Sequence, residues 1–119
     1  MKKIYFLSTC STCKKILKNW DISDSIKKID LKKTPISALD LKELYSLSNS
    51  YEALFNKRAV LFREKKKHLE IITEKEYKEM LLAHYSFLKR PVLIINEKLF
   101  VGNSKETVSK AALEIKSGF

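Results

Sequence analysis

The order of apolar and polar positions predicts a strand, a helix and a second strand in the first third of the chain. The run Ile4–Leu7 is β-branched and aromatic, which is typical of a buried strand and indicates one over about residues 3–7. Apolar residues then recur at helical spacing over about residues 12–20, namely Ile16, Leu17 and Trp20. Residues 25–31 again favour a strand. Because a helix joins the two strands, we expect them to be parallel.

The pattern becomes helical after the turn at residues 32–35 and stays so to about residue 88. Ser37 is a suitable N-cap for the first helix of this stretch. Thr73 and Glu76 have the spacing of a capping box and predict a later helix start. We interpret His84 as a histidine packed at the end of that later helix, because apolar stripes at helical spacing are usually core.

The last third returns to strands. Val92–Ile95 is a continuous apolar run suited to a buried strand. Residues 96–98 predict a tight turn, residues 99–101 a second hairpin strand, and residues 102–104 the cap of a helix that runs to about residue 115. The order is βαβ, a helical insert, then ββα. It predicts an α/β fold with one mixed sheet flanked by helices, forming a single domain over residues 1–119 with the insert at about 37–88.

Charge adds an expectation about partners. The chain of 119 residues carries 24 Lys and Arg against 14 Asp and Glu, a net charge of +10, which favours an anionic partner. Residues 63–68 form the densest basic block, either a solvated loop or a binding patch. No helix-turn-helix or other motif that recognises nucleic acid is present, so we expect no direct binding of nucleic acid. No apolar run is long enough to span a bilayer, so we expect no membrane partner and a cytoplasmic location.

Cys10 and Cys13 form a Cys-x-x-Cys unit where the first strand passes into the first helix. The unpaired N–H groups and partial positive charge of a helix start stabilise a thiolate, the reactive form of cysteine. Cys10 is therefore the candidate nucleophile and Cys13 its partner one turn further on. A structural disulfide is an alternative, although such bonds are rare in the cytosol. A zinc site would need His68 and His84, whose spacing resembles no zinc finger, so we expect no metal.

Three separated segments carry a family resemblance: the strand–Cys10-x-x-Cys13–helix unit, Asn56-Lys57-Arg58 in the helical insert, and Arg90-Pro91-Val92 before the final hairpin. Together they resemble the arsenate reductase (ArsC) family of the thioredoxin superfamily, which also contains the Spx regulators. The resemblance covers nearly the whole chain. It implies a thioredoxin-like fold of the glutaredoxin type.

The resemblance also implies roles for individual residues. Cys10 matches the nucleophile of the family, Arg58 and Arg90 match arginines that bind the oxyanion, and Pro91 matches the cis-proline. Lys14 lies where relatives usually carry an arginine, and the backbone N–H groups of Ser11, Thr12 and Cys13 would help to hold the anion. Two departures from the arsenate reductases are visible. Residues 99–103 lack the hairpin arginine of the family, and Cys13 is present as in Spx proteins.

The function implied in this way is a thiol-dependent reduction of an oxyanion such as arsenate. No cofactor would be bound, and glutathione, glutaredoxin or thioredoxin would donate the electrons. The alternative is a redox-sensing regulator of the Spx type that binds the α subunit of RNA polymerase, a reading favoured by Cys13, the missing hairpin arginine and the positive charge. In either case we expect a monomer.

Overall fold

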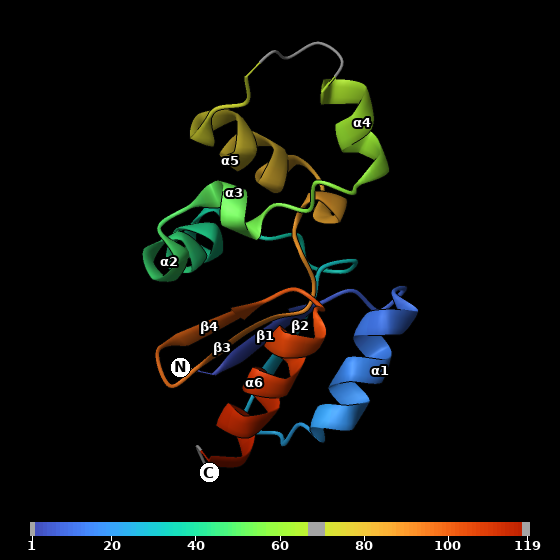
Figure 1. Cartoon of the computed structure of the whole chain (residues 1–119), viewed down its shortest axis with the longest axis vertical. Helices are drawn as coiled ribbons and strands as arrows, with labels where there is room; N and C mark the ends of the chain where they lie inside the picture. The colour runs from blue at the N-terminus through green and yellow to red at the C-terminus, as the bar shows by residue number, and fades with distance from the viewer. Residues whose placement is uncertain (1, 67–70, 118–119) are drawn as a thin grey trace. The chain divides into compact units, whose positions relative to one another are not determined.

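A computed structural model describes residues 2–66 and 71–117, apart from the side chain of Lys65. It contains a four-stranded sheet in the order β2-β1-β3-β4 (Figure 1). The strands are β1 (Lys3–Phe6), β2 (Lys27–Asp30), β3 (Val92–Ile95) and β4 (Lys98–Val101). β1 and β2 are parallel, as their connection by a helix predicts, whereas β3 is antiparallel to both β1 and β4. The sheet is therefore mixed, as expected.

Helices occupy the positions that apolar spacing and capping residues predict. They are α1 (Ser11–Trp20), α2 (Ala38–Ser48), α3 (Tyr51–Leu54), α4 (Val60–Lys66), α5 (Glu74–Ala83) and α6 (Lys105–Ser117), with a 3₁₀ turn η1 at Tyr85–Phe87. Ser37 accepts a hydrogen bond from the backbone N–H of Asp40 at the start of α2. Thr73 and Glu76 form the predicted capping box of α5. Both predicted helix starts are confirmed.

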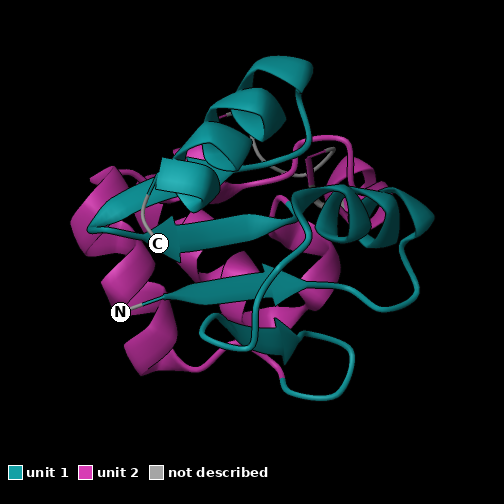
Figure 2. Cartoon of the chain, turned by 90° about the horizontal axis from the view of Figure 1, so that it is seen from below, with its two compact units in different colours: residues 1–34, 90–119 teal, residues 35–89 magenta. Residues whose placement is uncertain are grey.

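The chain divides into two compact units, which Figure 2 shows in different colours. Unit 1 comprises residues 1–34 and 90–119 and therefore contains the sheet with α1 and α6. Unit 2 comprises residues 35–89 and contains the other helices, in agreement with the predicted helical insert. That the whole chain behaves as one domain stays a prediction.

The core of unit 1 lies between the sheet and the helices α1 and α6. Trp20 at the end of α1 donates a hydrogen bond of 3.1 Å from Nε1 to the carbonyl of Val108 in α6, which ties these helices together. Figure 1 shows the two helices side by side. The buried side chains of this cluster come from the sheet, from both helices and from the residue before β2: Ile4, Ile16, Trp20, Ile26, Leu93, Ile95, Ala111 and Ile115. Their burial fixes α1, and with it the Cys-x-x-Cys unit, against the end of β1.

Unit 2 is held together by an aromatic group centred on Phe55, which is fully buried. Its ring stacks on Phe87 with centroids 5.3 Å apart and meets the edge of Phe62 at 4.9 Å. Tyr77 of α5 lies 4.8 Å from the same ring. The backbone of Phe55 pairs with Leu88 in an isolated antiparallel bridge, so the interior of the insert is joined to its C-terminal end within the unit.

The boundaries of some elements differ from those predicted. The hairpin turn contains only Asn96 and Glu97, because both adopt positive φ angles of 52° and 63° and Lys98 already pairs with Ile95. β2 stops at Asp30 instead of residue 31, because the backbone N–H groups of Lys33 and Thr34 both turn back to its carbonyl. β1 ends before Leu7, whose carbonyl accepts a hydrogen bond from Cys10.

Candidate functional site

Cys10 occupies the N-cap position of α1, at the end of the loop that follows β1. Its backbone is extended, with φ −96° and ψ 111°, while its carbonyl already accepts a hydrogen bond of 3.1 Å from the N–H of Lys14. Its own N–H donates to the carbonyl of Leu7 at 3.0 Å. The side chain of Cys10 is partly exposed. The thiol is therefore held at the positive end of the helix and is open to a reactant.

Asp30 anchors this loop from the neighbouring strand. Its Oδ1 accepts hydrogen bonds of 3.1 Å from the backbone N–H groups of Ser8 and Lys32. The hydrogen bonds from Ser8 are the main reason that the pKa of Asp30 is lowered. Sequence reasoning did not single out Asp30. The available signal was a short carboxylate at the end of a strand parallel to the one that leads to Cys10.

The surroundings of Cys10 favour its thiolate. Partial burial is the largest single influence and by itself raises the pKa. It is outweighed by hydrogen bonds from the backbone N–H and the thiol of Cys13, by the positive charge of Arg90 and by the backbone N–H of Thr12. The pKa of Cys10 is therefore lowered from the ordinary 9.0. The start of α1 and the guanidinium group of Arg90 therefore both stabilise the thiolate of Cys10.

Cys13 has the opposite character. Its side chain is only 1 % exposed, and burial raises its pKa to about 11. The neighbouring Cys10 sulfur raises the pKa of Cys13 further, whereas the backbone N–H of Leu7 and the positive charge of Arg90 lower it. The thiol of Cys13 thus stays protonated at neutral pH and donates a hydrogen bond to the Cys10 sulfur. Both cysteines are free thiols.

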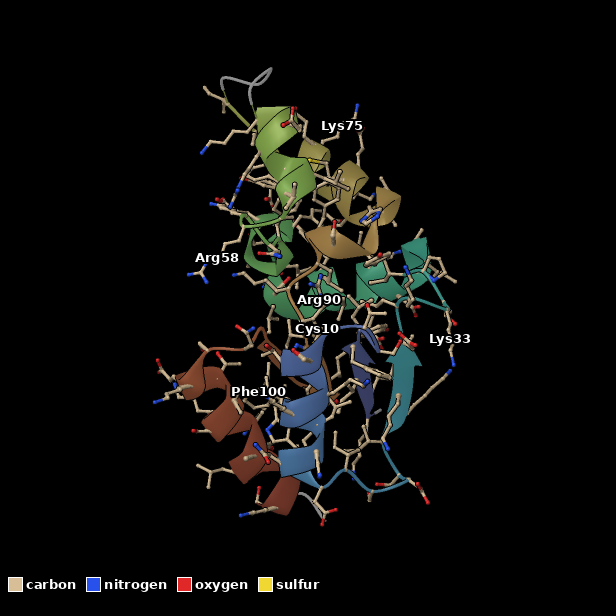
Figure 3. The ribbon with its side chains drawn as sticks, turned by 90° about the vertical axis from the view of Figure 1, so that its right-hand side faces the viewer. Cys10, Lys33, Arg58, Lys75, Arg90 and Phe100 are labelled. Atoms are coloured by element: carbon tan, nitrogen blue, oxygen red, sulfur yellow. The ribbon has the colours of Figure 1, made fainter. Side chains whose placement is uncertain are left out.

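Arg90 and Pro91 immediately precede β3 and are joined by a cis peptide bond. The carbonyl of Pro91 accepts a hydrogen bond of 2.9 Å from Gly102, which fixes this segment to the end of β4. Arg90 acts electrostatically on both cysteines. Figure 3 shows Arg90 and Cys10 as neighbours. The tertiary structure therefore brings together two pieces of the sequence pattern that are far apart along the chain.

The remaining predicted site residues lie in two places. Ser11, Thr12 and Lys14 are exposed on the first turn of α1, next to Cys10. Arg58 belongs to unit 2, where it is exposed on the turn before α4 and its backbone N–H donates to Oδ1 of Asn56 at 3.1 Å. The neighbouring Lys57 forms an ion pair with Glu52. The role of Arg58 in the site stays a prediction.

The described residues contain no group of three or more His, Cys, Asp and Glu side chains that could hold a metal ion. His84 caps the end of α5, where its Nδ1 accepts a hydrogen bond of 3.0 Å from the N–H of Ser86 and its ring stacks on Tyr85. This is the packed histidine expected at a helix end. His68, the other histidine considered, lies outside the described residues, as does Lys67 of the basic block.

The family model of the ArsC family matches residues 5–111, which include the Cys-x-x-Cys unit, Arg58 and Arg90. The chain belongs to the ArsC family. This match confirms the resemblance seen in the separated sequence motifs. ArsC family membership supports a thiol-dependent, oxidoreductase-like role that uses no bound cofactor.

Individual relatives agree with this assignment. The uncharacterized protein YusI of Bacillus subtilis is 32% identical over 103 residues, which cover 82% of this chain and 86% of that protein. A solved YFFB protein aligns with a TM-score of 0.77 and 22% identity over 97% of this chain and 99% of its own. The arsenate reductase from Vibrio cholerae aligns with a TM-score of 0.73 and 21% identity over 92% and 95% of the two chains. This member of the ArsC family thus has the thioredoxin-like fold.

No helix within residues 2–66 and 71–117 has the length and apolar character that a bilayer span requires.

Proposed function

We propose that this member of the ArsC family is a thiol-dependent oxidoreductase in which Cys10 attacks an oxyanion such as arsenate. The observation that carries the proposal is the sulfur of Cys10 at the N-cap of α1, with its pKa lowered beside Arg90. A nucleophile, backbone N–H donors and a cation in one place are the parts that an acceptor site for a tetrahedral anion needs. The cytoplasmic location expected from the sequence would keep both thiols reduced.

The proposed reaction has two steps. In the first, the Cys10 thiolate forms a bond to arsenic, and one oxygen of arsenate takes up protons and leaves as water. In the second, another thiolate attacks the Cys10 sulfur, which forms a disulfide. The electron pair of the sulfur–arsenic bond then stays on arsenic, which is released as arsenite. The two thiols lose two electrons in total when they form the disulfide. Arsenic gains these electrons and is reduced from the +5 to the +3 state.

The second thiol is either glutathione or Cys13. Cys13 hydrogen-bonds to Cys10 and lies in the same helix start, so a bond between them closes a very short loop. Its pKa of about 11 means that the thiol must lose its proton before it can attack. Bonding of Cys10 to arsenic removes the thiolate charge of Cys10, which is one of the influences that oppose this loss. Glutathione, glutaredoxin or thioredoxin would then reduce the disulfide.

The decisive experiment measures arsenate reduction with glutathione and glutaredoxin, and separately with thioredoxin. Cys10→Ser should abolish turnover in both assays. Cys13→Ser should abolish turnover only in the assay in which Cys13 resolves the adduct. Lys15→Gln, which changes an exposed residue on the same helix, serves as the matched control. Turnover that survives Cys10→Ser would eliminate the proposal.

A second function, a redox-sensing regulator that binds the α subunit of RNA polymerase, is favoured by two observations. The Cys10 and Cys13 side chains interact directly, as a disulfide switch requires. The β4 strand and the two residues after it contain no arginine to hold an oxyanion. Under this proposal arsenate reduction is absent, and a pull-down with the α subunit differs between the oxidised and reduced protein. No interaction in either redox state would count against it.

A further inference from the structure

A shallow depression lies along α1, on the side next to the edge strand β2. Its volume is about 410 Å³, and its lining residues all belong to unit 1: Phe6, Lys14, Leu17, Lys18, Asp21, Ile22 and Lys28. Only Lys14 belongs to the proposed Cys10 site. The other six lining residues have no part in the proposed redox chemistry, so most of the depression is a separate surface feature.

Three lysines surround the depression, and two elements supply them. Lys14 and Lys18 are one helical turn apart, so they project from the same face of α1. Lys28 pairs in register with Ile4, whose side chain is part of the core beneath α1, so Lys28 lies on that same face of the sheet. All three lysine side chains are exposed. The arrangement concentrates positive charge around one spot.

The floor of the depression is apolar. Phe6, Leu17 and Ile22 are partly buried against the core of unit 1, and each leaves part of its side chain uncovered. Lysines that only contact water would not need partly exposed apolar side chains between them. A partner that buries an apolar side chain there and places acidic groups against the lysines would satisfy both features.

We propose that this depression is a docking site for an acidic segment of a partner protein that inserts one apolar side chain between Lys14, Lys18 and Lys28. Charge complementarity argues for an acidic partner, because residues 1–34 carry nine lysines but only three aspartates and no glutamate. Small ligands are usually enclosed over most of their surface, which a shallow depression rimmed by exposed side chains does not allow. A polypeptide can instead add further contacts on the surface around the depression, and these contribute to its affinity.

Asp21 sets the orientation of such a segment. It is exposed at the end of α1 that lies away from Cys10, so an acidic group is repelled there and attracted toward Lys14. The acidic end of the partner is therefore expected on the side of Cys10. The docking proposal does not depend on the redox proposal, since Lys18 and Lys28 have no part in the chemistry of Cys10.

Calorimetric titration of the full chain with a blocked acidic peptide that carries one phenylalanine among aspartates tests the proposal. The peptide should bind. Lys18→Gln and Lys28→Gln should each weaken binding by about two- to fivefold, as expected for ion pairs at an exposed rim. The matched controls Lys15→Gln and Lys27→Gln each remove the same charge from the same helix and strand but outside the depression, and should leave the affinity nearly unchanged.

Further measurements separate docking from general charge attraction. Replacement of the peptide phenylalanine by alanine should weaken binding, and the methyl resonances of Leu17 and Ile22 should shift when the original peptide is added. Cys10→Ser should bind the peptide normally, so the two proposals can fail independently. No binding, equal losses in the control variants, indifference to the phenylalanine, or full competition by a short oligonucleotide or a small dicarboxylate would each overturn the docking proposal.

Discussion

The carboxylate of Asp30 accepts a hydrogen bond of 3.1 Å from the backbone N–H of Ser8, two residues before Cys10. It accepts a second bond of the same length from Lys32. One side chain on β2 therefore orders both its own turn and the loop that carries Cys10. Because Asp30 is not itself part of the Cys10 site, we regard it as a positioning residue.

Asp30→Asn should lower the thermal stability at neutral pH, since the loop loses a charged acceptor. The pKa of Asp30 is lowered from 3.8, so its contribution to stability is complete above that pH and is lost as the pH falls through the lowered value. The difference between the two proteins should therefore vanish in acid. Asp24→Asn, in the exposed loop before β2, is the control, and thermal melts over a pH series are the measurement.

Arg90→Gln should shift the ionisation of Cys10 to higher pH, because the positive charge that stabilises the thiolate is removed. The rate of alkylation by iodoacetamide as a function of pH reports this ionisation. In the wild-type protein a single fast-reacting thiol is expected to ionise below pH 9.0, and Cys10→Ser should eliminate it. An unchanged pH profile in Arg90→Gln would show that the guanidinium group does not act on the sulfur.

Cys13 should make the protein less stable in alkaline solution. Its pKa is about 11 in the folded chain against 9.0 for an ordinary thiol, so its contribution is complete below pH 9.0 and is lost as the pH rises to about 11. Urea unfolding at pH values across this window should show a decline that Cys13→Ala lacks. Equal pH dependence in both proteins would contradict the burial of a protonated thiol.

Leu93→Ala should cost about 2–5 kcal/mol of unfolding free energy, because the side chain is fully buried in the core of unit 1 and a cavity remains. Leu113→Ala is the matched control. Leu113 is 69% exposed on α6, and its replacement should change stability by less than about 0.5 kcal/mol. Urea denaturation of the two variants checks the assignment of these positions. Similar losses of unfolding free energy in both variants would contradict the assignment of Leu93 to the core and of Leu113 to the surface.

Glu97→Gly should stabilise the hairpin by about 1 kcal/mol, because Glu97 adopts a φ of 63° that a residue with a Cβ atom enters at a cost. Asn96, with a φ of 52°, tolerates this conformation better, so Asn96→Gly should gain less. The ranking of the two midpoints of thermal unfolding is the measurement. A loss of stability in Glu97→Gly would argue against the two-residue turn.

The sequence alone determined most of the local structure. Ser37 and Thr73 begin helices because their side chains accept hydrogen bonds from N–H groups only three residues away. The thiolate character of Cys10 was predictable for the same reason, since the helix start that stabilises it is formed by the next few residues. The parallel β1–β2 pair followed from the helix between the strands.

Only the tertiary structure decided what surrounds that thiolate. Arg90 acts on Cys10 because β3 pairs antiparallel with β1, and the loop is anchored because β2 ends with Asp30 beside it. The protonated state of Cys13 depends on its burial, and the lysine-rimmed depression depends on α1 lying next to Lys28. Hydrogen bonds within a helical turn can be predicted from neighbouring residues in the sequence. Contacts between distant segments depend on which strands pair and which surfaces are covered. Neighbouring residues do not specify either of these.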